Sequence, residues 1–213
     1  ARGVMLNRPA IFLGGQGGIV GPLRMGFGNV VAAGLVLRED CLADNRLIMG
    51  KNRSGKVIDY LPALYPNLLR IVENNILYLA NLAALKEWYI HVRKPFLEGR
   101  EFGPFIHAGL LDKLSLARKE RIKRLEAMAK RAAASDPSRS EKAARLRNEL
   151  GSTVNKVEQI FEADTAPDPQ VKALRGEFLA GLEKAVQGGG NYVETIQALP
   201  AGVSSKGTEW LDC

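Results

Sequence analysis

Residues 13–37 read LGGQGGIVGPLRMGFGNVVAAGLVL, and an aliphatic residue or methionine returns at every sixth position of this stretch. The recurring residues are Leu13, Ile19, Met25, Val31 and Leu37. A period of six fits neither an amphipathic helix nor an ordinary strand, but it is the repeat of a hexapeptide β-helix, in which each hexad forms a short strand and a turn. The stretch therefore predicts a short left-handed hexapeptide β-helix with the recurring side chains in its core.

Glycine and proline between these residues suit the corners of such a coil, as at Gly28, Gly34 and the Gly21-Pro22 pair. A generic glycine-rich loop followed by a buried strand remains an alternative, because it explains much of the same pattern. Only about two coils fit into the repeat, whereas at least about three repeat units are normally needed to bury a core. We therefore expect the chain to be the C-terminal portion of a longer protein.

Beyond residue 40 the period of six ends. Two short apolar runs, residues 46–49 and 56–60, flank a predicted turn. Helical periodicity follows, and the predicted helices cover residues 69–94, 104–134, 140–163 and 169–187. Pro95 should end the first of these helices because proline lacks the backbone N–H, and the glycines that follow residue 187 should end the last.

These elements predict a mixed α and β fold with two parts. Residues 1–60 would form the end of the β-helix and its exit strands. Residues 61–213 would form a mainly antiparallel α-helical bundle with an irregular C-terminal tail, since short connections favour antiparallel neighbours.

The composition is that of an ordinary globular chain, with 46% hydrophobic and 25% charged residues and a net charge of +7. No run of apolar residues approaches the length of a membrane span, and no secretory leader opens the chain. Cys41 and Cys213 are too far apart in the sequence to suggest a disulfide framework or a metal site. We expect a cytoplasmic protein with no membrane partner and no bound metal.

The segment over residues 19–49 resembles the last coil and exit strand of bacterial sugar-1-phosphate nucleotidyltransferases. The similarity lies in the patterns Met25-Gly26-x-Gly28, Val31-Ala32-Ala33-Gly34-x-Val36 and Arg38-x-Asp40, which are most similar to the bifunctional N-acetylglucosamine-1-phosphate uridyltransferase type. It covers roughly the first 50 residues. The helical remainder resembles the helical extension of UDP-N-acetylglucosamine pyrophosphorylase-related proteins.

This resemblance implies a C-terminal module of a sugar-nucleotide-forming enzyme. An upstream domain would transfer the uridylyl group to an N-acetylhexosamine 1-phosphate and would hold the Mg²⁺, because the nucleotidyl-transfer motif is absent from this chain. No catalytic residue can be assigned here. The module would serve oligomerisation, as a homotrimer packed through flat β-helix faces, together with a possible groove for coenzyme A or a sugar phosphate.

The resemblance also implies candidate binding residues. The equivalents of Ala32, Ala33 and Gly34 offer backbone N–H groups to coenzyme A in related acetyltransferases, and Lys51 stands near the basic residue expected after the exit strand. Three polar residues of the repeat, Gln16, Arg24 and Asn29, have either a structural role at corners or a substrate-binding role in a groove between copies.

Acetyltransferases of this kind use a histidine of the β-helix as the general base. His91 and His107 lie outside the repeat, and we expect each to be a surface or packing residue. His91 belongs to a cluster at residues 88–94 that could hold a sugar phosphate, although aromatic residues at helical spacing are more often core residues.

The alternative function is a non-enzymatic interaction module. Residues 118–131 read RKERIKRLEAMAKR and carry seven basic residues against Glu120 and Glu126. This run could bind nucleic acid or another anionic partner. The interpretation that we favour is a solvated helix face with ion pairs from Glu120 to Arg124 and from Glu126 to Lys130. The absence of aromatic residues within the run disfavours nucleic acid.

Overall fold

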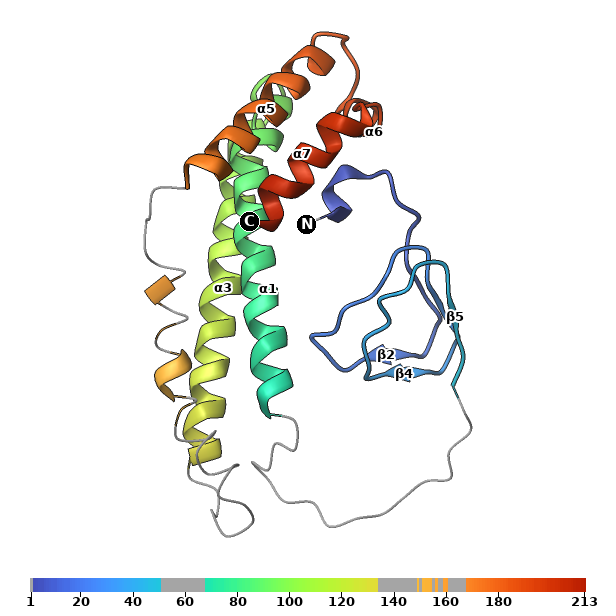
Figure 1. Ribbon diagram of the computed structural model, residues 1–213, viewed down its shortest axis with the longest axis vertical. Helices are drawn as coiled ribbons and strands as arrows, with labels where there is room; N and C mark the ends of the chain where they lie inside the picture. Colours follow the sequence, from blue (N-terminus) through green and yellow to red (C-terminus); the bar gives the residue numbers. More distant parts are fainter. Residues whose placement is uncertain are drawn as a thin grey trace.

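The computed structural model of the protein describes residues 2–50, 68–133 and 168–213, together with residues 149, 151–154, 156, 159 and 160. Short parallel strands make up the N-terminal part, and the rest is mostly helical (Figure 1). The predicted turn between residues 46–49 and 56–60 lies largely outside the described residues. So does most of the helix predicted over residues 140–163, although the few described residues there are helical.

The N-terminal part begins with a 3₁₀ helix, η1 (Arg2–Met5), and continues with five strands of two residues each. These are β1 (Phe12–Leu13), β2 (Gly18–Ile19), β3 (Val30–Val31), β4 (Val36–Leu37) and β5 (Leu47–Ile48). A parallel sheet joins the strands in the order β1-β3-β5, and a second parallel sheet joins β2 to β4. Phe12 pairs with Val30 and Val30 with Leu47, so neighbouring strands of the larger sheet come from successive passes of the chain.

The predicted left-handed hexapeptide β-helix is wrong. Within residues 2–50 the structure holds two small parallel sheets and no β-helix. Val31 and Leu37 are buried, but Leu13 and Ile19 are 51% and 44% exposed, so the recurring side chains do not share one closed core. Glycine fills many of the positions between them, and because glycine is unfavourable in strands, each strand stays two residues long.

The first helical layer is an antiparallel pair. Helix α1 (Leu68–Trp88) continues through a π-helical turn, η2 (Tyr89–Arg93), into α2 (Pro95–Glu98), and α3 (Gly103–Ala133) runs back beside α1 (Figure 1). The prediction that Pro95 ends the first helix needs correction, because Pro95 occupies the first turn of α2. A proline is tolerated there because the first-turn N–H groups have no helical acceptor. The preceding π-type turn closes with a 3.2 Å hydrogen bond from the Lys94 N–H to the Tyr89 carbonyl.

The second helical layer covers one end of this pair. It consists of α5 (Pro169–Val186), α6 (Tyr192–Gln197) and α7 (Ala201–Asp212). Asp168 caps α5 by accepting a 2.8 Å hydrogen bond from the Gln170 N–H. The predicted irregular tail is wrong, because Asn191 and Glu194 form a capping box that starts α6, and α7 packs against α5.

Buried side chains form two clusters at different heights along α1. The α1–α3 core lies between these helices and includes Val154. Its members are Leu68, Val72, Leu79, Ile122, Leu125, Ala129, Ala132 and Val154. The α5–α7 core joins η1 to the second helical layer. Its members are Met5, Trp88, Val92, Phe178, Leu182, Ile196, Leu199, Trp210 and Leu211. Burial of these apolar side chains is the main favourable contribution to the fold.

One helical stretch, Leu68–Glu98, is long and apolar enough to cross a membrane, with a hydropathy of 1.2 over its best window. Only 28% of that window is buried inside the protein. Length and composition alone are weak support for a membrane span, because the core helix of a soluble protein passes the same test. The absence of a membrane partner therefore stays a prediction.

Candidate anion-binding site

A cavity of about 490 Å³ lies where the strand region meets α1 and α3. We call it the arginine cavity, because Arg38, Arg70, Arg121 and Arg124 line it. Its described lining also includes two asparagines of α1 and contains no aspartate or glutamate. The cavity thus collects cationic groups from segments that are far apart in the sequence.

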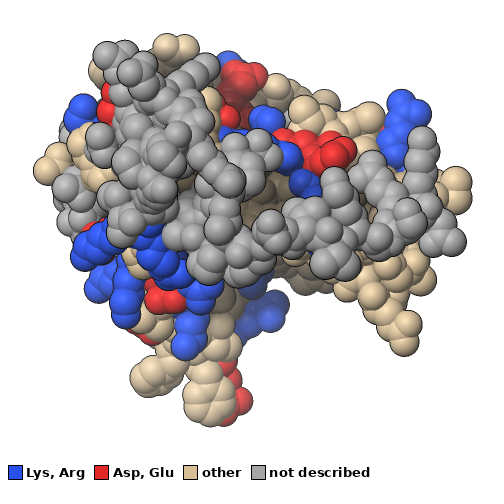
Figure 2. Space-filling view, turned by 90° about the horizontal axis from the view of Figure 1, so that it is seen from below, with Lys and Arg blue, Asp and Glu red and all other residues tan. Residues whose placement is uncertain are grey.

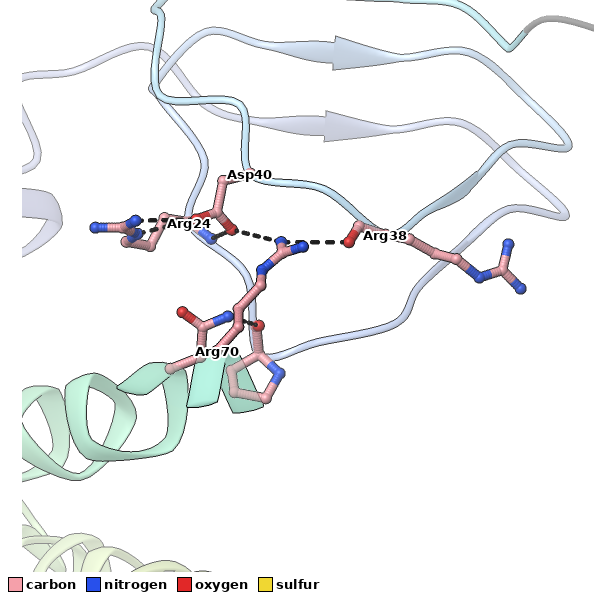
Figure 3. Close-up of polar contacts among 6 residues, drawn as sticks. Arg24, Arg38, Asp40 and Arg70 are labelled. Carbon is pink, nitrogen blue, oxygen red and sulfur yellow. Dashed lines mark hydrogen bonds and ion pairs between the residues drawn. The ribbon is translucent and has the colours of Figure 1, made fainter. Parts of the chain in front are cut away.

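Arg70, on the first turn of α1, reaches across to the strand region (Figure 3). Its Nη2 lies 3.4 Å from Asp40 Oδ1 and 3.4 Å from the Arg38 carbonyl oxygen. The side chain of Arg38 points away from this contact (Figure 3). Both Arg70 bonds are long, so they hold the guanidinium in place through weak hydrogen bonds and one ion pair.

Asp40 also binds Arg24, which makes it the centre of a small network. The Arg24 backbone N–H donates to Oδ1 at 3.0 Å, and the Arg24 Nε donates to Oδ2 at 3.1 Å. The backbone N–H of Arg24, its side-chain hydrogen bond and the positive charges of Arg24 and Arg70 hold the pKa of Asp40 below its usual value. The carboxylate therefore stays ionised and fixes Arg70 at the cavity edge.

Two asparagines occupy buried positions on the cavity side of α1. Asn74 is 8% exposed, and its Nδ2 donates to the Pro22 carbonyl at 2.9 Å. Asn75 is 5% exposed, and its Oδ1 accepts a 3.1 Å hydrogen bond from Arg121 Nη1. Asn74 thus joins the helix to the strand region, whereas Asn75 orients an arginine.

The two arginines of α3 have further partners within the helical part. The Arg121 guanidinium lies 4.4 Å from the centre of the Tyr78 ring, a cation–π contact. Arg124 donates through Nε to Glu120 Oε1 at 2.8 Å, and this hydrogen bond lowers the pKa of Glu120. One predicted ion pair of the basic run is therefore confirmed. The other, between Glu126 and Lys130, does not form among the described residues.

The chemistry of this arrangement suits an anion. A guanidinium presents several N–H donors in a fixed plane that matches a phosphate or carboxylate. The four arginines of the lining outnumber the two carboxylates, Asp40 and Glu120, that pair with members of this set. Lys and Arg side chains gather over one part of the molecule when it is viewed from below in Figure 2.

The polar residues predicted from the repeat do not meet in one place. Arg24 touches the edge of the cavity network through Asp40. Asn29 is fully buried, where its Nδ2 donates to the Ala43 carbonyl at 3.0 Å and its Oδ1 accepts from the Arg46 N–H at 2.7 Å. Gln16 is exposed, with a left-handed φ of 55°. The structure thus gives Asn29 a role in holding successive passes of the chain together.

The residues expected to contact coenzyme A have their own hydrogen bonds. The Ala32 N–H donates to the Ile48 carbonyl and the Gly34 N–H to the Gly15 carbonyl, each at 2.9 Å. Ala33 lies between them, and Lys51 falls outside the described residues. Two of the three expected backbone donors are therefore occupied within the protein.

The histidines and the aromatic cluster near residue 90 contact other protein groups. His107 Nε2 lies 3.0 Å from the Tyr89 carbonyl, in the π-helical turn. Trp88 is 1% exposed and donates to the Tyr192 hydroxyl at 3.0 Å, and Arg93 covers the Tyr192 ring at 3.9 Å. These contacts support the packing interpretation of Trp88 over the sugar-phosphate interpretation.

Sequence reasoning did not select Arg70, Asn74 or Asn75. The sequence held a signal for one of them, because Asn75 falls on the apolar stripe that predicts α1, between Val72 and Leu79, and a polar residue at a buried helix position needs a partner. Arg121 and Arg124 were recognised only as part of the basic run. In the part of the chain that the structure describes, no group of three His, Cys, Asp or Glu side chains could hold a metal ion.

Comparisons of the chain with protein-family models, with curated proteins and with solved structures give no match in any of the three.

Proposed function

We propose that the protein binds a phosphate-bearing ligand in the arginine cavity. The observation that carries this proposal is the convergence of Arg70, Arg121 and Arg124 on one cavity whose described lining has no carboxylate. Arginine clusters of this kind recognise phosphate through charge-assisted, often bidentate hydrogen bonds.

The contacts of the three arginines support a preorganised binding site over a chance cluster of charged residues. Arg70 is positioned by Asp40 and Arg121 by Asn75, so two of the guanidinium groups are oriented before a ligand arrives. Arg70 and Arg124 have side chains that are 41% and 72% exposed, which leaves them accessible. Preorganised groups of this kind reduce the entropy lost on binding.

A small phosphorylated molecule fits this cavity better than a polymer does. The volume of about 490 Å³ is within the range of small-molecule pockets, and apolar side chains such as Ile71 and Leu125 line it beside the arginines. A sugar phosphate or sugar nucleotide combines such a charged group with a less polar body. This ligand class agrees with the groove that the sequence resemblance implies.

The direct test is calorimetric titration with inorganic pyrophosphate, N-acetylglucosamine 1-phosphate and UDP-N-acetylglucosamine at one fixed, low ionic strength. We expect Arg70→Gln and Arg124→Gln each to weaken binding by about tenfold, the loss of one hydrogen bond to a charged group. Arg131→Gln is the matched control, because Arg131 lies exposed on α3 and outside the cavity lining.

The pattern of losses separates this proposal from the alternative function. Equal weakening by Arg70→Gln, Arg124→Gln and Arg131→Gln would contradict a discrete cavity site. It would favour the basic run at residues 118–131 as a general surface for nucleic acid or another polyanion, with a steep salt dependence. No binding of any of the three probes would overturn the proposal.

The wider expectations remain proposals. We keep four of them as proposals: an upstream uridylyltransferase domain with its Mg²⁺, a coenzyme A groove, a homotrimer and a cytoplasmic location. The trimer was expected from the flat faces of a β-helix, so it needs its own test by light scattering of the purified chain.

A further inference from the structure

A second, larger cavity of about 810 Å³ lies further along α1, between α1, α3, α5 and α7. Alanines of α1, including Ala80, Ala83 and Ala84, form much of one wall. Larger apolar side chains, among them Leu114 and Val171, form the opposite walls. Small residues on α1 leave this volume unfilled, so we call it the alanine cavity.

Charged side chains also line the alanine cavity. They include Lys86, Arg118 and Asp212, and a second group of three that is joined by hydrogen bonds. Glu87 and His91 follow Ala83 by one and two helical turns, and Arg175 reaches them from α5. Arg175 Nη1 lies 3.3 Å from Glu87 Oε2 and 3.2 Å from His91 Nε2. Burial and the nearby charge of Arg175 lower the pKa of His91, although Glu87 opposes this effect.

We propose that the alanine cavity binds a small monocarboxylate with an apolar body. Its carboxylate would pair with Arg175, and its body would lie along Ala83, Leu114 and Val171. A cavity that offers both apolar walls and charged side chains suits a ligand of this kind.

The geometry of Arg175 favours a carboxylate at this position. Its side chain is 22% exposed, so it can be reached from the cavity. Within the described residues its hydrogen bonds use only Nη1, which leaves other guanidinium N–H groups for a bidentate contact. Glu87 is the only acidic partner of Arg175 there, and its negative charge disfavours a ligand with two charges on the same group.

Trp210 provides a local optical signal. It lines the alanine cavity, whereas the other tryptophan, Trp88, is 1% exposed and does not line it. A ligand in the cavity should therefore change the fluorescence of Trp210, and Trp210→Phe should remove most of the ligand-dependent change.

The test compares three probes that share one apolar chain: decanoate, decanol and decylamine, each below its micelle concentration. In fluorescence and calorimetric titrations we expect decanoate to bind tightest and Arg175→Gln to weaken it by about tenfold, with little effect on decanol. The matched control is Lys172→Gln, which removes a positive charge from an exposed position on the same helix and outside the cavity lining.

A second variant keeps the proposal testable even if Arg175→Gln does not fold. Glu87→Gln removes the carboxylate that competes for Arg175, so it should tighten decanoate binding. Equal affinity for decanoate and decanol, or equal effects of Arg175→Gln and Lys172→Gln, would overturn the carboxylate site. Pyrophosphate binding to the arginine cavity should be unchanged in Glu87→Gln and Arg175→Gln, so the two proposals can fail separately.

Discussion

Asp40 lies between two arginines that belong to different parts of the molecule. Arg24 comes from the strand region and Arg70 from α1, and both place nitrogen atoms within 3.4 Å of the carboxylate. The side chain of Asp40 is only 19% exposed, so water screens these contacts less than at an open surface. One carboxylate therefore serves both the attachment of the strand region and the orientation of a cavity arginine.

The residue-scale prediction concerns Asp40→Asn. Because the amide carries no charge, the variant should lose about 1 kcal/mol of unfolding free energy near neutral pH, the upper end of the range for ion pairs with partly exposed partners. The folded pKa of Asp40 lies below its ordinary value, so the carboxylate stabilises the fold above the unfolded pKa. This stabilisation is lost as the pH falls through the folded pKa.

Urea denaturation of both proteins from about pH 7 to about pH 3 measures this effect, since the ordinary pKa of aspartate is near 3.9. The difference between wild type and Asp40→Asn should shrink toward the acidic end. Asp112→Asn on α3 is the control, because Asp112 is exposed and has no ion pair in the described part of the chain. A difference that stays constant over this pH range would contradict the role assigned to the Asp40 charge.

At the scale of elements, the crossing of α5 and α7 depends on close approach at a glycine. A Cβ added to Gly181 of α5 would lie 2.7 Å from Val203 Cγ1 and 2.8 Å from Val203 Cγ2. Valine is stiff at χ1, so this side chain cannot easily turn aside. The same helix contains Gly176, where an added Cβ would meet no atom within 4 Å.

These two glycines give a matched pair of substitutions on one helix. Gly181→Ala should destabilise the protein by about 1–3 kcal/mol through overpacking against α7. Gly176→Ala should instead stabilise it by about 0.5–1 kcal/mol, because alanine has the higher helix propensity. Thermal and urea unfolding monitored by circular dichroism measure both. Equal effects of the two substitutions would show that α5 and α7 do not approach closely at Gly181.

The helices could largely be predicted from sequence, whereas the strand region could not. The apolar stripe that runs through Val72 and Leu79 predicts α1 because side chains three and four apart share a helix face. A period of six in residues 13–37 does not by itself place side chains on one face of a helix or strand. Whether Leu13 and Val31 become buried together depends on long-range pairing, and Leu13 is exposed while Val31 is buried. The arginine cavity was missed for the same reason, since Arg70 and Arg121 meet only through tertiary packing.

At the scale of the whole molecule, η1 and the strand region are attached to the helices at two separate places. One is the polar contact of Asp40 and Pro22 with the first turns of α1. The other is apolar, where Met5 of η1 enters the α5–α7 core and is 2% exposed. Met5 Cε lies 2.6 Å from the position that a Cβ on Gly207 of α7 would take, so the side chain fills space that this glycine leaves.

The whole-molecule prediction is that Met5→Ala lowers the unfolding free energy by about 2–5 kcal/mol, because it leaves a cavity in the α5–α7 core. Met49→Ala is the matched control, since Met49 is 70% exposed and should change stability by less than about 0.5 kcal/mol.

The two attachment points belong to different contact clusters, so the effects of Met5→Ala and Asp40→Asn should add if the chain unfolds in one step. Urea unfolding monitored by tryptophan fluorescence and by far-ultraviolet circular dichroism tests this. Transitions that separate in Met5→Ala would show that η1 couples the strand region to α7, whereas an unaltered stability would show that Met5 does not belong to the core.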